Sequence, residues 1–177
     1  MLLDIAFGIF AAIIYATIYK TGLGFGVLLI CILFALSPDL DFIISAIFNK
    51  KFPGHTHRDL FHYPIPFILL GSTCIALIFN IHFGILFAIL SFAHFVHDTI
   101  GIGWGVPWLF PISRNYLKLT PFSNTVTHWW TPREQERIAS KYGDPNWFKN
   151  IYLRPTLISM PEFIVFLIAI FVLIYFK

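Results

Sequence analysis

Three short segments of the chain bring together side chains that bind metal ions. They read "PDLD" at 38–41, "HTHRDLFH" at 55–62 and "HFVHD" at 94–98. Carboxylate oxygens and imidazole nitrogens are ligands of zinc, and also of manganese and iron. His94 and Asp98 are four residues apart, so a helix places both on one face. This spacing predicts part of a divalent metal site, whose chemistry would be hydrolysis by an activated water.

The three segments interrupt a chain that is otherwise unusually apolar. Hydrophobic residues make up 58% of the sequence and charged residues 12%, whereas about a quarter of the residues of a soluble protein are charged. The chain is therefore predicted to be an integral membrane protein. Asp39 and Asp41 directly follow the apolar run "GVLLICILFAL". Because a charge near the bilayer interior costs a few kcal/mol or more, a bound cation is the predicted reason that these acids stay ionised.

The apolar stretches predict an all-α fold, an integral membrane helical bundle with about five spans. A helix needs roughly 20 apolar residues to cross the hydrocarbon core. The predicted spans lie near 3–19, 22–38, 64–80, 82–98 and 161–176, within a single integral membrane domain over 1–177. Residues 99–160 are predicted to form a loop that lies on the membrane surface. Within this loop a short helix is predicted after Thr131, which forms a capping box with Glu134.

The distribution of basic residues predicts which side of the membrane each loop occupies. Ten of the twelve Lys and Arg residues lie in the two long loops, 38–63 and 99–160, and only Lys20 and Lys177 lie outside them. The positive-inside rule places both loops and the N-terminus in the cytoplasm of a prokaryotic cell, with the C-terminus outside. All five tryptophans also lie in the second loop, and indole rings favour the headgroup zone. The three polar segments are thus predicted to meet at the cytoplasmic surface.

Six residues in these segments are predicted metal ligands: Asp39, Asp41, His57, His62, His94 and Asp98. Asp39 and Asp41 are also candidate catalytic groups, because they either bridge two ions or leave one carboxylate free as general base. Arg58 is the predicted clamp for an anionic substrate group, since guanidinium matches phosphate with paired hydrogen bonds. Zinc is the favoured cofactor, with manganese or iron as alternatives.

Other polar residues near the predicted spans are less strongly indicated as metal ligands. His55 and His97 are candidates for residues that contact a metal ligand and fix its orientation without binding the metal. His82 and His128 have no acidic neighbours in the sequence and are interpreted as interfacial residues. Glu162 stands in capping-box spacing with Ser159 around Pro161, which explains it as an acid favoured at a helix N-terminus.

The sequence also resembles the YdjM family of membrane-bound, metal-dependent hydrolases. The resemblance lies in "SPDLDF" at 37–42, "HRDLFH" at 57–62 and "HFVHDTIGIGWGVPWLFPIS" at 94–113. The corresponding family patterns are Pro-Asp-Ile-Asp, His-Arg-Gly-x-Thr-His-Ser, and His-x-x-x-Asp followed by Trp-Gly-Val-Pro. The resemblance implies a distant kinship with zinc-dependent phospholipases C and single-strand nucleases. It also implies that the six residues above are the metal ligands.

The chain departs from the family pattern in two places. Asp59, Phe61 and Tyr63 stand where the family typically has Gly, Thr and Ser. The histidine often found near the family's N-terminus is missing. Asp4 is either its substitute or an acid favoured at the start of a helix.

The predicted function is metal-dependent hydrolysis of a phosphoester or lipid headgroup at the membrane surface. Membrane lipids or another amphiphile are the expected partners, and the scattered basic residues give no sign of nucleic-acid binding. The alternative is a non-enzymatic metal-binding membrane protein or small transporter. A lipid phosphatase of the vanadium-peroxidase type is a poorer match, because its Pro-Ser-Gly-His motif is absent. A purely structural membrane protein would keep its folding and metal content after alanine substitution at all six positions.

Overall fold

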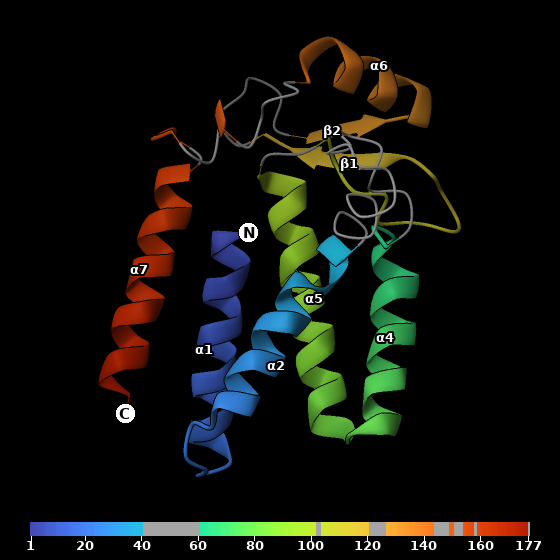
Figure 1. The fold of residues 1–177 in the computed structure, drawn as a ribbon. Coiled ribbons are helices and arrows are strands. Elements are labelled where there is room, and N and C mark those ends of the chain that lie inside the picture. Colours follow the sequence, from blue (N-terminus) through green and yellow to red (C-terminus); the bar gives the residue numbers. More distant parts are fainter. Residues whose placement is uncertain are drawn as a thin grey trace.

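Apolar α-helices dominate the structure, a computed structural model that describes residues 1–40, 61–101, 104–120, 127–143, 149–150, 154–157 and 159–176. The apolar helices are α1 (Leu2–Ile18), α2 (Phe25–Leu36), α4 (Pro64–Ile78), α5 (Ile81–Ile100) and α7 (Ser159–Tyr175). A short 3-10 turn, η1 (Ser37–Asp39), continues α2. The helices form a bundle in Figure 1. The prediction of a mostly helical protein is therefore confirmed.

The helices differ in whether they are long enough to cross a membrane. Within the described residues, α5 is the one helix of at least 18 residues with sufficient hydropathy, and it has 20 residues. The other apolar helices are shorter, with 17 residues in α1 and α7, 15 in α4 and 12 in α2. Five spans are thus not supported by helix length, although the predicted boundaries lie within about three residues of the observed ones.

Small side chains allow α1 to approach two of its neighbours closely. Against α2, a Cβ added to Gly8 would lie 2.7 Å from the Cα of Ile32. Against α7, one core cluster is formed by Ala6, Ile9, Ile13 and Ala169. A second cluster joins α1, α2 and α5 and consists of Ala12, Cys31, Phe34, Ala35, Phe87 and Leu90. Close contact of this kind is how helices associate where lipid provides little hydrophobic driving force.

The region after α5 contains the predicted short helix together with two strands that were not predicted. Helix α6 (Pro132–Tyr142) begins with the predicted capping box between Thr131 and Glu134. Strands β1 (Tyr116–Leu119) and β2 (Thr127–Trp130) form an antiparallel pair in which Tyr116 lies opposite Trp130. Strands of four residues leave almost no periodic signal in a sequence. A two-stranded ribbon also depends on contacts with the rest of the protein, which no local pattern reveals.

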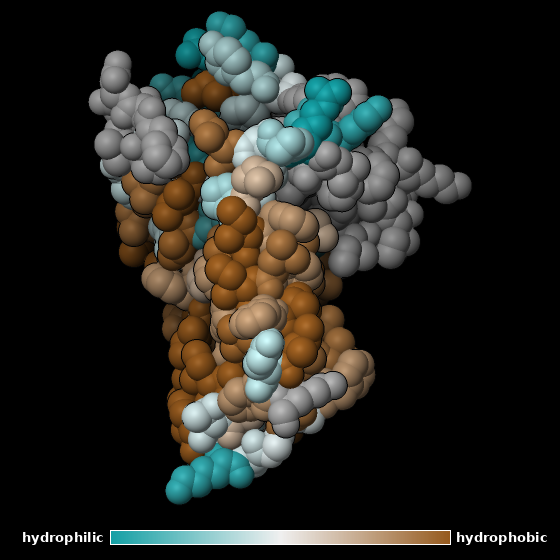
Figure 2. All heavy atoms as spheres, turned by 90° about the vertical axis from the view of Figure 1, so that its left-hand side faces the viewer, coloured by the Kyte–Doolittle hydropathy of each residue, from teal (hydrophilic) through white to brown (hydrophobic). Residues whose placement is uncertain are grey.

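The strands and α6 lie over one end of the bundle (Figure 1). Helices α1 and α7 begin at this end and α5 ends there, while the C-terminus lies at the opposite end. The view in Figure 2 shows a largely apolar surface along the bundle, with hydrophilic residues gathered near both ends. This pattern is typical of a protein embedded in a membrane.

Candidate metal centre

Three of the predicted ligands converge where α2, α4 and α5 meet. One donor atom each from Asp39, His62 and His94 lies within 4.8 Å of the others. Both histidines are 1% exposed, whereas the Asp39 side chain is 27% exposed. A buried pair of imidazoles beside a partly accessible carboxylate is a suitable arrangement for a metal ion that solvent can reach.

The separations between these donors fit ligands that share one ion. His94 Nε2 lies 3.6 Å and His62 Nε2 lies 3.9 Å from Asp39 Oδ1. Two ligands of a tetrahedral zinc ion, each about 2.0–2.1 Å from the metal, lie about 3.4 Å apart. The observed distances are therefore close to those of a coordinated group. They are longer than ordinary hydrogen bonds.

Asp98 lies beside the same group of donors. Its Oδ2 atom is 3.2 Å from His62 Nε2 and 3.8 Å from His94 Nε2. His94 and Asp98 are one helical turn apart on α5, as the sequence spacing predicted. The structure thus brings four of the six predicted ligands together.

Asp39, His62 and Asp98 are each positioned near the end of a helix. Asp39 is the last residue of η1, in which Pro38 is buried and Ser37 Oγ donates a hydrogen bond to Phe34 O over 2.8 Å. His62 precedes α4, whose first residue, Pro64, is also buried. Proline is favoured at the first position of a helix because its missing N–H is not needed there. The site therefore lies where three helical elements start or stop.

The segment after α5 packs onto the helix end that carries Asp98. Trp108 Nε1 donates a 2.8 Å hydrogen bond to Thr99 Oγ1, directly after Asp98. The Lys118 ammonium on β1 donates to the carbonyl of Gly101, the C-terminal cap of α5. A cation is favoured at a helix C-terminus, where carbonyl groups lack helical partners. These contacts attach the strands and α6 to the end of the bundle that holds the candidate site.

Comparison with known protein families matches residues 3–177 to the YdjM inner membrane protein family. This chain belongs to the YdjM family. No curated protein and no solved structure matches it. The YdjM match covers all four residues of the candidate site, and the family description agrees with the prediction of a membrane protein.

The rest of the predicted YdjM site lies outside the described residues. Asp41, His57 and Arg58, and also His55, belong to the stretch 41–60, which the structure does not describe. His57 as a ligand and Arg58 as an anion clamp therefore stay predictions. The same holds for Asp41 as a ligand or base.

Two acids of this YdjM chain have partners that the sequence analysis missed. Glu162 was assigned to a capping box with Ser159, but its Oε1 lies 3.2 Å from Nε2 of His97. Glu162 lies in the first turn of α7, as predicted, but its carboxylate is only 4% exposed, because α7 packs against α1. Asp4, at the start of α1, is 1% exposed and contacts both His94 and His97. An acid in the first turn of an otherwise apolar helix was the available signal in both cases.

The histidines interpreted as interfacial lie away from this group. His82 Nδ1 contacts the Tyr19 hydroxyl, where the turn after α1 meets the start of α5. His128 on β2 lies 3.1 Å from Thr120 Oγ1. Neither histidine contacts a carboxylate among the described ion pairs.

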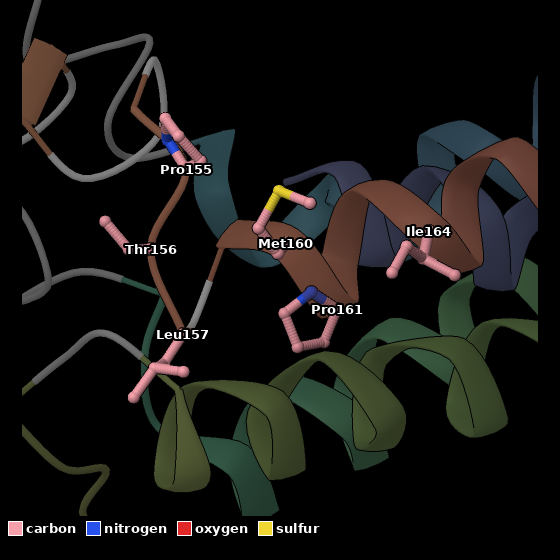
Figure 3. Close-up of a pocket in the computed structure, with 6 residues that line it drawn as sticks. All are labelled: Pro155, Thr156, Leu157, Met160, Pro161 and Ile164. Carbon is pink, nitrogen blue, oxygen red and sulfur yellow. The ribbon is translucent and has the colours of Figure 1, made fainter.

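The structure also has a surface hollow that is separate from the ligand group. It has a volume of about 440 Å³ and is lined by Pro155, Thr156, Leu157, Met160, Pro161 and Ile164. Figure 3 shows these residues on the first turns of α7 and the segment before it. None of the four described candidate ligands lines this hollow, which is mostly apolar.

Proposed function

We propose that this YdjM-family chain is a membrane-bound, metal-dependent hydrolase that acts on a phosphoester or lipid headgroup. The observation that carries the proposal is the convergence of Asp39, His62 and His94, with their donor atoms within 4.8 Å of one another. These residues come from three separate parts of the chain, and ordinary helix packing does not require polar groups at their meeting point.

The residues present fit a divalent cation. His94 Nε2 is buried and makes no hydrogen bond within the described part of the chain. A buried polar atom in this condition costs about 1–3 kcal/mol, and a metal ion would offset that cost. The mixed set of imidazole nitrogens and carboxylate oxygens favours zinc, with manganese and iron as alternatives.

The roles of the residues follow from their positions. His62, His94 and Asp98 hold the ion, together with Asp39, and we add Asp41 and His57 from the sequence. When bound, such an ion polarises a phosphoryl or carbonyl oxygen and makes water more acidic. Asp39 is the partly exposed member of the group, so Asp39, or Asp41 beside it in sequence, takes the proton from the attacking water. Arg58 binds the anionic part of the substrate.

The site is proposed to lie on the cytoplasmic face of the membrane. Helices α1, α4 and α7 would be about 23–26 Å long at 1.5 Å per residue, against a hydrocarbon core of about 30 Å. Local thinning of the bilayer and flanking polar residues accommodate such a difference. We therefore propose five spans, with α2 extended by η1. A site at this surface favours an amphiphilic substrate over a small soluble one.

The proposal predicts that the protein, purified in detergent, retains a stoichiometric transition metal, measured by elemental analysis. His62→Ala and His94→Ala are each expected to lose it, because each removes one donor from the group. His82→Ala is the matched control, since it makes the same change on α5 at the opposite end of the bundle. Metal retained in both site variants would contradict the proposal.

Turnover is tested separately from metal binding. Hydrolysis of a panel of phospholipids and phosphodiesters is expected to stop on chelation and to return when zinc is restored. Arg58→Ala is expected to raise KM for anionic substrates more than it lowers kcat, because the guanidinium binds the substrate throughout the reaction. Stoichiometric metal without hydrolysis of any member of the panel would instead favour the non-enzymatic metal-binding alternative.

A further inference from the structure

Asp4 lies directly behind one of the proposed ligands. Its Oδ1 atom is 3.3 Å from His94 Nδ1, and the same nitrogen is 3.0 Å from the carbonyl oxygen of Ala35. A carboxylate and a carbonyl only accept hydrogen bonds, so His94 Nδ1 must carry the hydrogen. The lone pair of the neutral ring is then on Nε2, the atom that faces Asp39.

Asp4 is itself held by two further side chains. Its Oδ1 atom is also 3.1 Å from His97 Nδ1, and the other nitrogen of that ring is 3.2 Å from Glu162 Oε1. Because each nitrogen of His97 faces one carboxylate, the ring cannot rotate without losing a contact. The second oxygen of Asp4 is 2.8 Å from the amine of Met1. Oδ1 is the atom that faces both imidazoles.

The position of Asp4 is not explained by helix capping alone. An acid that merely favours a helix N-terminus interacts with the unpaired N–H groups of its own first turn and is usually exposed. Asp4 is 1% exposed and reaches from α1 to two histidines on α5. Burial of a carboxylate among apolar helices is costly unless it is paired. The contacts of Asp4 with the two histidines, and not its place at the start of α1, therefore explain why an acid is buried here.

We propose that Asp4 is a positioning residue for the metal site, which, together with the Ala35 carbonyl that accepts the hydrogen bond from Nδ1, fixes the orientation and tautomer of the His94 ring. His97 and Glu162 hold Asp4 in place, so that α1, α5 and α7 together support one ligand. The inference depends on the proposed function and adds three residues that do not themselves bind the metal. A carboxylate that accepts from the second nitrogen of a ligating histidine raises the basicity of the ligand and restrains its ring.

The test is the dissociation constant for zinc, measured by competition with a chelating dye on the full-length protein in detergent. Asp4→Asn is expected to bind zinc at unchanged stoichiometry but about 10–100-fold more weakly, the loss typical of such supporting partners. His94→Ala is expected to lose stoichiometric binding. Asp4→Glu, which keeps the carboxylate, is expected to recover part of the affinity.

Two further variants separate positioning from general loss of packing. Tyr19→Phe also removes a polar contact between the end of α1 and α5. This contact, between the Tyr19 hydroxyl and His82, lies at the other end of the bundle from Asp4. Tyr19→Phe is expected to leave zinc affinity unchanged. Glu162 reaches His94 only through His97 and Asp4. Glu162→Gln is therefore expected to weaken zinc binding less than Asp4→Asn does. It provides the test if Asp4→Asn does not fold.

The outcomes distinguish this inference from the proposed function. Unchanged zinc affinity in both Asp4→Asn and Glu162→Gln overturns the positioning role and leaves the metal site intact. Equal weakening by Asp4→Asn and Tyr19→Phe also overturns it, because the effect would then be a general loss of packing. A wild-type protein that binds no metal ion overturns both proposals.

Discussion

Among the described residues, the three buried acids, Asp4, Asp98 and Glu162, and the partly exposed Asp39 each lie beside an imidazole. Asp98 lies 3.2 Å from His62, and Glu162 lies 3.2 Å from His97. Asp39 and Asp4 both contact His94, on opposite nitrogens of its ring. A carboxylate inside an apolar bundle is expensive unless it is paired. The pairing accounts for how these acids survive where they are, and His94 links the proposed ligands to their supporting residues.

Glu134, which lies outside the bundle, allows the contribution of a capping carboxylate to the stability of α6 to be tested. Its pKa is lowered from the usual glutamate value because the backbone N–H of Thr131, and then the Thr131 hydroxyl, donate to its carboxylate. A carboxyl group with a lowered pKa stabilises the folded state above its ordinary pKa, and this contribution is lost as pH falls through the lowered value. Backbone amides of α6 are expected to exchange more slowly in the wild type than in Glu134→Gln at neutral pH.

Hydrogen exchange of the segment 131–143, compared between the two proteins at the same pH, measures this difference. The wild-type advantage should shrink as the pH is lowered toward the range in which Glu134 becomes protonated. An advantage that stays constant with pH would contradict the capping role of the carboxylate. Arg133→Gln serves as a control, because Arg133 is an exposed neighbour of Glu134 in the first turn of α6.

At the scale of elements, the contact between α1 and α2 depends on a missing side chain. A Cβ atom at Gly8 would lie 2.7 Å from the Cα of Ile32 and 3.0 Å from the carbonyl oxygen of Cys31. Both are backbone atoms, so a rotamer change cannot relieve the overlap. Gly8→Ala is expected to destabilise the protein by about 1–3 kcal/mol, the usual cost of overpacking. A lower midpoint of thermal unfolding in detergent, followed by circular dichroism, would be the measured result.

Gly26 on α2 provides the control for that substitution. A Cβ added there meets no atom within 4 Å, and alanine is a better helix former than glycine. Gly26→Ala is therefore expected to leave the unfolding midpoint unchanged or to raise it. If both substitutions lowered the midpoint equally, close approach of α1 to α2 would not be the reason that Gly8 is required.

Helix α5 is the element on which the site depends most. Its 20 residues carry His94 and Asp98 toward the ligand group, while His97 faces Asp4 and Glu162. The period of the α-helix explains this division. Residues four apart share a face, and His97, three residues after His94 and one before Asp98, lies to one side of that face and still reaches Asp4 together with His94. The His94–Asp98 pair was predicted from this period, and His97 was predicted as an orienting residue. The identity of its partners was not predicted.

In the molecule as a whole, the two ends of the bundle carry different elements. The strands, α6 and the candidate site lie at one end, and the turn after α1 and the C-terminus lie at the other (Figure 1). We propose that the first end faces the cytoplasm, because ten of the twelve Lys and Arg residues belong to the two long loops predicted from the sequence, and the positive-inside rule favours the cytoplasm for such loops. The two ends should therefore differ in their accessibility from outside the cell.

Single cysteines introduced in a Cys31→Ser, Cys74→Ser background test this orientation in intact cells. Lys20→Cys, in the turn after α1, is expected to react with a membrane-impermeant maleimide added from outside. Lys141→Cys, on α6, is expected to react only after the cells are opened. Both residues are exposed in the structure, so a difference in labelling reports sidedness. Labelling of Lys141→Cys in intact cells would reverse the proposed orientation of the site.

Features that depend on neighbouring residues in the chain could be predicted from the sequence. The apolar helices follow from stretches of hydrophobic residues, the start of α6 from the spacing of Thr131 and Glu134, and the facing of His94 and Asp98 from one helical turn. Local hydrogen bonding and helical period are sufficient for each of these. Membership of the YdjM family was likewise indicated by short motifs in the sequence.

Which acid contacts which imidazole depends on how the helices pack. Asp4 and His97 are 93 residues apart, and His97 and Glu162 are 65 apart. Their contacts depend on how far α1, α5 and α7 are rotated and shifted along one another, which small residues at the helix contacts permit and no local pattern encodes. The same holds for β1 and β2, whose pairing is stabilised by contacts with the rest of the protein.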